Sequence, residues 1–272
     1  MTFDWKTLRE PAPASLAGAR QIAHYAVQWV AQAASANLPA APDDSHSALA
    51  WNAQLGALVS AAFPGDTTVG LQLESLELVV IQDAKPDRLA LHGLASSTVN
   101  DWLAGKLTAR GCKAHSNVKL PYAVPAQPLS REPGLAGLSR WYGAAADVLE
   151  AVRARYGNIE PGPGPVRCWP HHFDIALVVQ LEEGAGESAR SIGVGFSPGD
   201  EYYQEPYFYV SPYPSPKNPA LPALPPGGHW HTKDFLGAVA SAQEFLVLPE
   251  PRGAVMAIVD AAFGAGRKWL EG

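Results

Sequence analysis

The residues best suited to chemistry begin in the segment RCWPHHFDIALVVQL, which covers positions 167–181. Two adjacent histidines, His171 and His172, stand near its start, and Asp174 follows two residues after the second. The apolar remainder predicts a β-strand, on which residues two apart share a face. His172 and Asp174 are therefore expected to point the same way, together with Cys168. His171 is expected on the opposite face.

A second pair of histidines occurs in GHWHTKDF, where His229 and His231 would share a face if the segment is extended. Two imidazoles side by side suit zinc or another divalent ion of the same class. Between the two histidine segments lies the turn-like motif SPGD, which places Asp200 at a loop tip. Glu205 then leads into an aromatic strand. These acidic residues are candidates to complete a site.

One hypothesis is a metal centre that holds a divalent ion such as zinc. Its candidate ligands are His171, His172, Asp174, Asp200, His229 and His231. A site with three histidines and one open position is a catalytic zinc arrangement, because the bound ion activates water. Such a centre predicts a metal-assisted hydrolase.

A second hypothesis needs no metal. The candidate catalytic residues are His172, Asp174 and Glu205, since an imidazole beside a carboxylate serves as an acid–base pair near neutral pH. Four tyrosines would then form the wall of a pocket for a small polar molecule: Tyr202, Tyr203, Tyr207 and Tyr209. The structural alternative is that the same residues form a hydrogen-bonded network without activity.

Composition restricts the partners. The chain has 272 residues, 47% of them hydrophobic, and a formal net charge of −6, which argues against nucleic acid as a partner. No run of about 18 apolar residues predicts a membrane span, and the first ten residues do not resemble a signal peptide. Cys112 and Cys168 lack a CxxC spacing, so a cytoplasmic protein with reduced thiols is expected.

Helices and runs of strands must position these residues. Apolar spacing predicts helices over residues 13–37, 48–63, 96–111, 135–156 and 253–270. Strands are predicted over residues 67–82, 88–94, 112–122, 166–181, 191–196 and 206–211. A change in the apolar alternation predicts a bulge near Ser75, Ser96 is expected to cap its helix, and His24 is expected at the polar margin of the first helix.

Consecutive strands between helices predict an α+β fold, with antiparallel sheets packed against amphipathic helices. We expect a single domain over residues 1–272. It divides into possible halves 1–126 and 127–272, each reading helix, strands, helix, which are joined by a proline-rich connector.

The motifs WPHHFD, SPGD and EPYFYV resemble those of a group of uncharacterised bacterial proteins. They are more distantly similar to a domain-of-unknown-function family, five-nine-nine-six. The resemblance covers roughly residues 166–235 and implies no assigned activity. In the closer group His172, Asp174, Asp200 and Glu205 match, whereas His171 is often glutamate. The positions of His229 and His231 are not reliably histidine there, which favours a carboxylate-rich site or a structural network over a three-histidine metal site.

The leading prediction is a polar pocket beside the start of the 167–181 strand that binds a divalent metal or a small polar ligand. It would hydrolyse or isomerise that ligand. The rival prediction is a non-catalytic interaction protein whose aromatic and proline-rich segments form a contact surface. Whether the chain is an enzyme, and its oligomeric state, stay open at this point.

Overall fold

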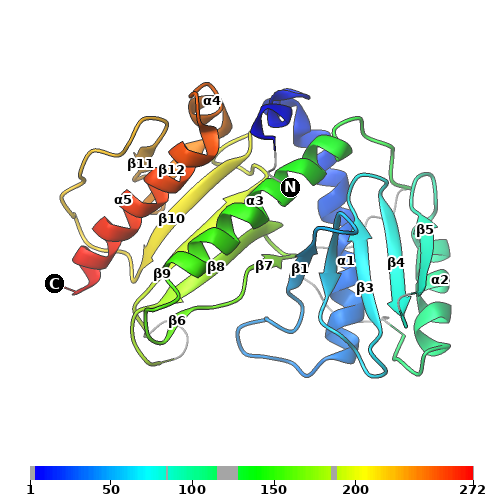
Figure 1. Cartoon of the computed structure of the whole chain (residues 1–272). Coiled ribbons are helices and arrows are strands. Elements are labelled where there is room, and N and C mark those ends of the chain that lie inside the picture. Colours follow the sequence, from blue (N-terminus) through cyan, green and yellow to red (C-terminus); the bar gives the residue numbers. More distant parts are fainter. Residues whose placement is uncertain (1–3, 84, 115–127, 185–188, 272) are drawn as a thin grey trace. The chain divides into compact units, whose positions relative to one another are not determined.

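The computed structural model describes residues 4–83, 85–114, 128–184 and 189–271 (Figure 1). Its contacts divide the chain into two compact units. Unit 1 comprises Met1–Ser15, Ala144–Val166 and Asp174–Gly272, and unit 2 comprises Leu16–Gly143 and Arg167–Phe173. These units follow other boundaries than the predicted halves 1–126 and 127–272. The prediction of one domain stays a prediction.

Unit 2 is an antiparallel sheet with helices packed on it. Its strands, in spatial order, are β7 (Arg167–Trp169), β1 (Leu49–Asn52), β2 (Ala57–Ser60), β3 (Thr68–Gln72), β4 (Glu77–Gln82) and β5 (Lys85–Ala90). The helix α1 (Ala17–Asn37), which follows a short 3-10 turn, η2 (Pro13–Leu16), packs on β2 and β3. The helix α2 (Ser96–Thr108) packs on β4.

The helix predicted over residues 48–63 is wrong, because this segment forms the β1–β2 hairpin. The side-chain oxygen of Asn52 accepts the backbone N–H groups of Gln54 and Leu55, each at 3.1 Å. Gly56 follows with a φ of 59°, in the left-handed region that glycine adopts without strain. Local bonding from an asparagine side chain competes with helix formation, and here it sets a turn.

The single strand predicted over residues 67–82 is also wrong. It is a hairpin of β3 and β4, and Leu76, at the turn between them, has a φ of 53°. The change in apolar alternation near Ser75 therefore marks a turn rather than a bulge. The predicted cap on α2 is wrong as well, since Ala95 occupies the cap position without a side-chain bond. The strand predicted over residues 112–122 lies mostly outside the described residues.

Unit 1 is also built on antiparallel strands. Its strands, in spatial order, are β11 (His229–His231), β12 (Gly237–Ser241), β10 (Tyr207–Tyr213), β9 (Ser191–Ser197) and β8 (Asp174–Gln180), with β6 (Gly162–Pro163) paired to β8. Its helical segments are η1 (Trp5–Arg9), the C-terminal part of α3 (Leu135–Arg155), α4 (Ala242–Phe245) and α5 (Pro251–Glu271).

The helices α3 and α5 confirm the predictions over residues 135–156 and 253–270. α5 packs on β9, β10 and β12. It does so through the apolar stripe that the sequence predicts, and Val255, Ile258 and Val259 are at most 2% exposed. Burial of such side chains is worth roughly 1.5–3 kcal/mol each, so this stripe anchors the helix to its sheet.

The strand predicted over residues 166–181 is interrupted. It forms β7 and β8, which belong to different units, with a turn over residues 170–173. Phe173 has a φ of 61°, and its backbone N–H donates to the carbonyl oxygen of Trp169 at 2.6 Å. The strand alternation does not run through this turn. The predicted shared face of Cys168, His172 and Asp174 is therefore wrong.

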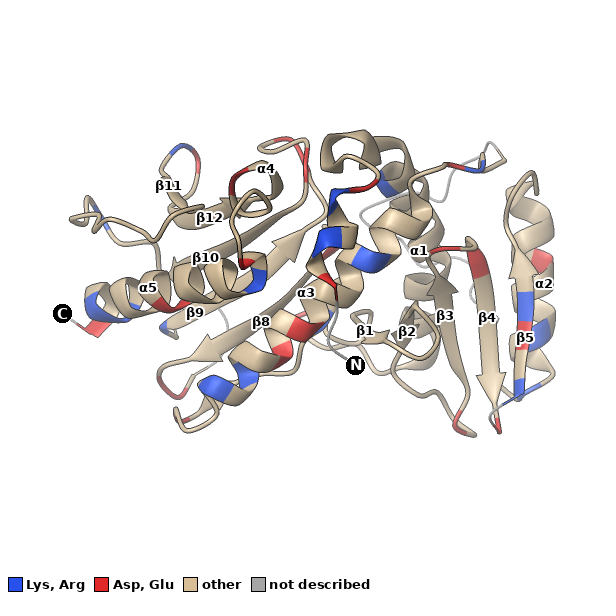
Figure 2. Ribbon diagram, turned by 45° about the horizontal axis from the view of Figure 1, so that its top comes forward, with Lys and Arg blue, Asp and Glu red and all other residues tan. Residues whose placement is uncertain are grey.

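The predicted α+β class and the antiparallel pairing are confirmed in both units. Charged residues lie along α3, α5 and the edge strand β5 (Figure 2), whereas β9 and β10 carry none. Among the described residues, no helix combines the length and apolar character that a membrane crossing needs.

Candidate functional site

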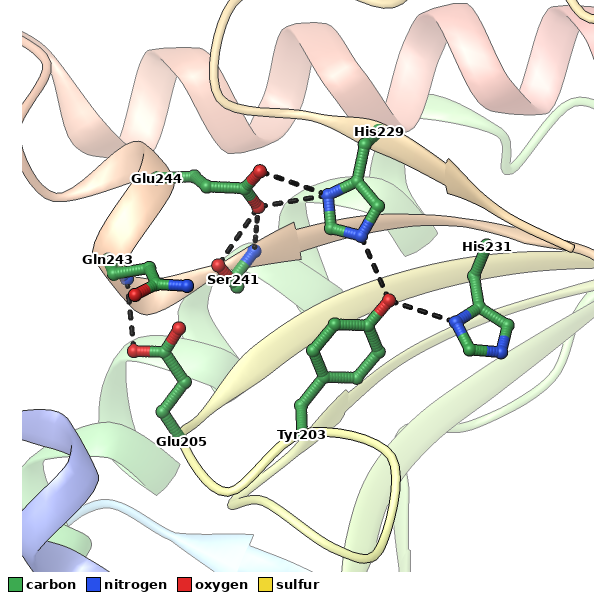
Figure 3. Close-up of polar contacts among 7 residues, drawn as sticks. All are labelled: Tyr203, Glu205, His229, His231, Ser241, Gln243 and Glu244. Carbon is green, nitrogen blue, oxygen red and sulfur yellow. Dashed lines mark hydrogen bonds and ion pairs between the residues drawn. The ribbon is translucent and has the colours of Figure 1, made fainter. Parts of the chain in front are cut away.

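A chain of polar contacts in unit 1 centres on the hydroxyl group of Tyr203 (Figure 3). This oxygen lies 2.9 Å from Nε2 of His229 and 2.9 Å from Nδ1 of His231. On the far side of the first ring, both carboxylate oxygens of Glu244 lie 3.0 Å from Nδ1 of His229. The order is thus carboxylate, imidazole, phenol, imidazole.

The pairing of β11 with β12 places these groups. His229 and His231 are two residues apart on β11, so their rings lie on one side of the strand, as the HxH spacing predicts. The chain leaves β12 directly into α4, which carries Glu244. A capping box fixes that carboxylate, because its Oε2 accepts the hydroxyl of Ser241 at 2.9 Å and the backbone N–H of Ser241 at 3.3 Å.

Tyr203 is positioned by the turn that contains Asp200. One carboxylate oxygen of Asp200 accepts the backbone N–H groups of Tyr202 at 2.9 Å and Tyr203 at 3.2 Å. The other accepts the hydroxyls of Ser197 at 3.1 Å and Tyr207 at 2.6 Å. Asp200 does stand in a turn, as predicted. Its side chain is saturated by donors of that turn and of the adjoining strands, which gives it a structural role.

The two imidazole contacts of the Tyr203 hydroxyl need one proton more than neutral side chains supply. The Glu244 carboxylate requires a proton on Nδ1 of His229, and the carbonyl oxygen of Lys233 requires one on Nε2 of His231. In two neutral rings, both nitrogens that face Tyr203 are then acceptors, and the phenol has a single proton for them. Filling both contacts with hydrogen bonds needs one further proton.

Burial raises the pKa of the Tyr203 phenol, and the charges of Glu244 and Asp200 raise it further. The phenol therefore keeps its proton at neutral pH and can donate a hydrogen bond. The side chains of His229 and Glu244 are 37% and 36% exposed, so a solute can reach this end of the network.

Glu205, a predicted catalytic residue, stands apart from the phenol. Its carboxylate accepts the backbone N–H of Gln243 at 3.2 Å, at the start of α4 (Figure 3). Burial is the main cause that raises its pKa, and the charge of Glu244 adds to that effect. The contacts of Glu205 fit a role at the start of α4.

Asp174 takes part in a phenol–carboxylate pair. Its Oδ2 accepts the hydroxyl of Tyr209 at 2.5 Å. Burial raises the pKa of this phenol well above its usual range, and the charge of Asp174 is the next cause. The ring of Tyr209 lies over Gly195 of β9, where a Cβ atom would approach its hydroxyl oxygen to 2.3 Å. The close approach of ring and backbone is the reason that this strand position holds glycine.

The WPHHFD turn belongs to unit 2, where α1 holds it. His24 lies 2.9 Å through Nε2 from the carbonyl oxygen of Pro170, and Gln28 donates to the same oxygen at 2.7 Å. The His24 ring stacks on Phe173, with centroids 5.1 Å apart. Burial lowers the pKa of His24 to about 4, the backbone bonds opposing it. The expectation that His24 marks a polar margin missed this role.

His171 and His172 are neighbours within the same turn, with ring centroids 4.4 Å apart. Burial lowers the pKa of His171, and the charge of His172 lowers it further. Both histidines lie in unit 2, whereas Asp174 and the four later candidate residues lie in unit 1. The prediction that all of them share one pocket stays a prediction.

The contacts of unit 1 do not favour the predicted metal centre. Both ring nitrogens of His229 and of His231 already have partners, which are Glu244, Tyr203 and the carbonyl oxygen of Lys233. Across the described ranges, no group of three or more histidine, cysteine, aspartate or glutamate side chains is placed to hold a metal ion.

Sequence reasoning missed Glu244 and gave Tyr203 only a place in a pocket wall. The signal for Glu244 was present, because Ser241 followed three residues later by glutamate is a capping box. Nothing local pointed from that box to His229, since the contact depends on the pairing of β11 with β12.

Comparisons of the chain with protein-family models, with curated proteins and with solved structures find no match. The resemblance to the uncharacterised bacterial group and to family five-nine-nine-six therefore stays an expectation.

Proposed function

We propose that unit 1 binds a small polar molecule at the Tyr203 network and exchanges a proton with it. The observation that carries this proposal is the position of the Tyr203 hydroxyl between His229 and His231, with Glu244 behind the first ring. A carboxylate that orients an imidazole, which in turn contacts a hydroxyl, is the arrangement by which proteins adjust the proton affinity of that hydroxyl.

Each residue of the network would have its own role in this proton exchange. When Tyr203 takes a proton from the ligand, its own proton moves to Nε2 of His229. In the reverse direction, the imidazolium of His229 returns that proton as Tyr203 gives one to the ligand. Glu244 is a positioning residue, because it holds one tautomer of His229. His231 offers a second acceptor on the other side of the phenol. The reaction class that fits is an isomerisation or a hydrolysis that needs proton transfer and no redox cofactor.

This proposal moves the acid–base role away from His172 and Glu205, which the sequence suggests for it. Glu205 is engaged at the start of α4, and His172 lies in the other unit. A metal ion is not part of the proposal, since the ring nitrogens that would bind one are occupied by hydrogen-bonding partners.

A structural role is the competing proposal, and one observation favours it. Glu244 also closes the capping box of α4, so the whole chain of contacts would serve to fasten β11 and the Asp200 turn to α4. On that view Tyr203 is a bridge between two strand residues, and no ligand is needed.

Imidazole NMR on the full chain separates the two. The histidine ring nitrogens are labelled, and small carboxylic acids, amines and sugars are added to the wild type, to Tyr203→Phe and to Tyr202→Phe. The last is a matched control, because Tyr202 is an exposed neighbour with its ring against His231.

Binding at the network predicts that one class of compound shifts the His229 and His231 signals in the wild type and in Tyr202→Phe, but not in Tyr203→Phe. If no compound moves these signals, or if Tyr203→Phe responds like the wild type, the ligand-binding proposal is wrong and the structural role is favoured.

A further inference from the structure

A hollow lies beside the Tyr203 network in unit 1, and we infer that it binds a small hydroxylated amine. It has a volume of about 530 Å³, between the proline-rich loop after β10 and the turn that joins β11 to β12. This volume lies within the range of roughly 300–1,000 Å³ typical of small-molecule sites. The inference extends the proposed function, because it gives the ligand of that function a class and a location.

Polar side chains line the hollow on both sides. Ser215 and Asn218 come from the loop, and Thr232 and Asp234 come from the turn. Within the described part of the chain, none of these four side chains forms a hydrogen bond with protein. Two hydroxyls, one amide and one carboxylate are therefore available to a ligand that carries several donors and acceptors.

The charge of the lining favours a cation. Asp234 is the charged residue among those that line the hollow. Lys217 and Lys233 adjoin the lining residues Asn218 and Asp234 in the sequence, but neither lysine lines the hollow. A ligand ammonium group would therefore meet a carboxylate without a competing protein cation, and a hydrogen bond between charged groups is roughly twice as strong as a neutral one.

Apolar surface completes the hollow. Phe235 lines it from the turn, and Leu221, which is 41% exposed, lines it from the loop. An apolar wall facing several hydroxyl and amide groups suits a compound with a C–H face and a hydroxylated edge. An amino sugar or a comparable amino alcohol has both.

Phe235 connects the hollow to the Tyr203 network. Its ring stacks on His231, with centroids 4.1 Å apart and planes 17° apart. The Tyr202 ring meets both of them edge-on, at 5.2 Å from Phe235 and 5.5 Å from His231. A ligand that packs on Phe235 would thus lie next to a ring that contacts the proposed proton donor.

The loop wall is held in place before any ligand arrives. The indole N–H of Trp230 donates to the carbonyl oxygen of Pro222 at 2.7 Å, and the Trp230 ring packs against Trp269 at 5.1 Å. A preformed wall lowers the entropy cost of binding. The hollow is therefore suited to a ligand of modest size.

Three probes of nearly equal shape test the inference. Glucosamine carries an ammonium group, glucose is neutral, and glucuronate carries a carboxylate. Each is titrated into the full chain and followed by amide NMR. Glucosamine is expected to shift the signals of Asn218, Thr232 and Asp234 and to bind about tenfold more tightly than glucose, whereas glucuronate is expected to bind least.

Two variants assign the site. Asp234→Asn should weaken glucosamine about tenfold and leave glucose unchanged, whereas Glu201→Gln, a control at an exposed acidic residue outside the lining, should change neither. If Tyr203→Phe still binds glucosamine but no longer transmits a shift to His229, which contacts the Tyr203 hydroxyl, both proposals stand. If Tyr203→Phe binds glucosamine and transmits the shift like the wild type, the binding site in the hollow is supported and the proposed proton exchange at Tyr203 is wrong. The inference is overturned if glucuronate binds as tightly as glucosamine, or if no probe shifts the lining residues.

Discussion

Glu244 contacts Nδ1 of His229 through both of its carboxylate oxygens, each at 3.0 Å, while one of them also accepts the hydroxyl of Ser241. One side chain thus serves the start of α4 and the orientation of an imidazole. The capping box and the contact with His229 use the same carboxylate. Only a substitution that keeps one of these interactions and removes the other can separate the two roles.

Glu244→Ala and Glu244→Gln provide such a pair. Glutamine can close a capping box and alanine cannot, so we expect Glu244→Ala to lower the free energy of unfolding by about 1 kcal/mol. Glu244→Gln should retain most of the stability and lose the charge beside His229. Urea denaturation measures both, with Glu201→Ala as an exposed control. Equal losses in the two Glu244 variants would contradict the capping role.

The buried phenol of Tyr209 predicts instability in alkali. Its pKa is raised in the folded chain, by burial and then by the Asp174 charge. The unfolded chain therefore releases this proton first, at a pKa of about 10. Stability should fall as the pH rises above that value, and Tyr209→Phe should reduce the slope by about 1.4 kcal/mol per pH unit.

Unfolding free energies measured from pH 7 to 11 test this prediction. Below pH 9 the slopes of the wild type and Tyr209→Phe should agree, which serves as an internal control. Slopes that stay parallel above pH 10 would show that Tyr209 ionises equally in both states.

The partly buried imidazole of His24 predicts instability in acid. Its pKa is lowered to about 4 by burial, from a usual value of 6.5. Between these values the unfolded chain binds the extra proton, so stability falls as the pH drops from 6.5 toward 4. The full effect is at most about 3 kcal/mol.

His24→Gln should flatten this part of the curve, even if it lowers stability at pH 7 through the contact with Pro170. Denaturant unfolding at several pH values from 4 to 7 measures the slope. A variant whose curve runs parallel to the wild type would show that His24 is not the responsible group.

The closed conformation of the loop that lines the hollow should depend on Trp230. Trp230→Phe removes the indole N–H that donates to Pro222 and keeps an aromatic ring. We expect faster cleavage by trypsin after Lys217, because opening of the loop becomes easier. Trp51→Phe, a change of equal size in unit 2, should leave cleavage at this site unchanged. An unchanged rate in Trp230→Phe would contradict the pinning role.

Apolar spacing was enough to predict α1, α3 and α5. Each of these helices buries one continuous stripe, and the residues that form it are close in sequence, as with Val255, Ile258 and Val259. The antiparallel α+β class followed from the order of such local patterns.

The sequence predicts the turns less well than the helices, because the conformation of one or two residues determines whether the chain reverses. Asn52 and Gly56 convert an apolar stretch into a hairpin, and Leu76 reverses the chain within another. In the β1–β2 hairpin, Asn52 and Gly56 are residue types typical of turns, and the sequence shows both. A leucine with positive φ offers no such signal, since the hairpin pairing imposes it.

The candidate site was found only in part. The shared face of His229 and His231 is a local property of an HxH segment. Their joint contact with Tyr203, and the approach of Glu244, depend on the register between β11 and β12 and on the path of the Asp200 turn. Spacing along the chain carries no information about such pairings.

Trp5 is buried against Phe208 and Phe245, and Arg9 donates to the carbonyl oxygen of Leu246 at 2.5 Å. During synthesis the N-terminal segment leaves the ribosome more than two hundred residues before these partners do. Until then its tryptophan lacks its contacts with Phe208 and Phe245. Unit 1 can be completed only after translation has passed Leu246, so chaperones that shield nascent apolar segments should engage this chain early and release it late.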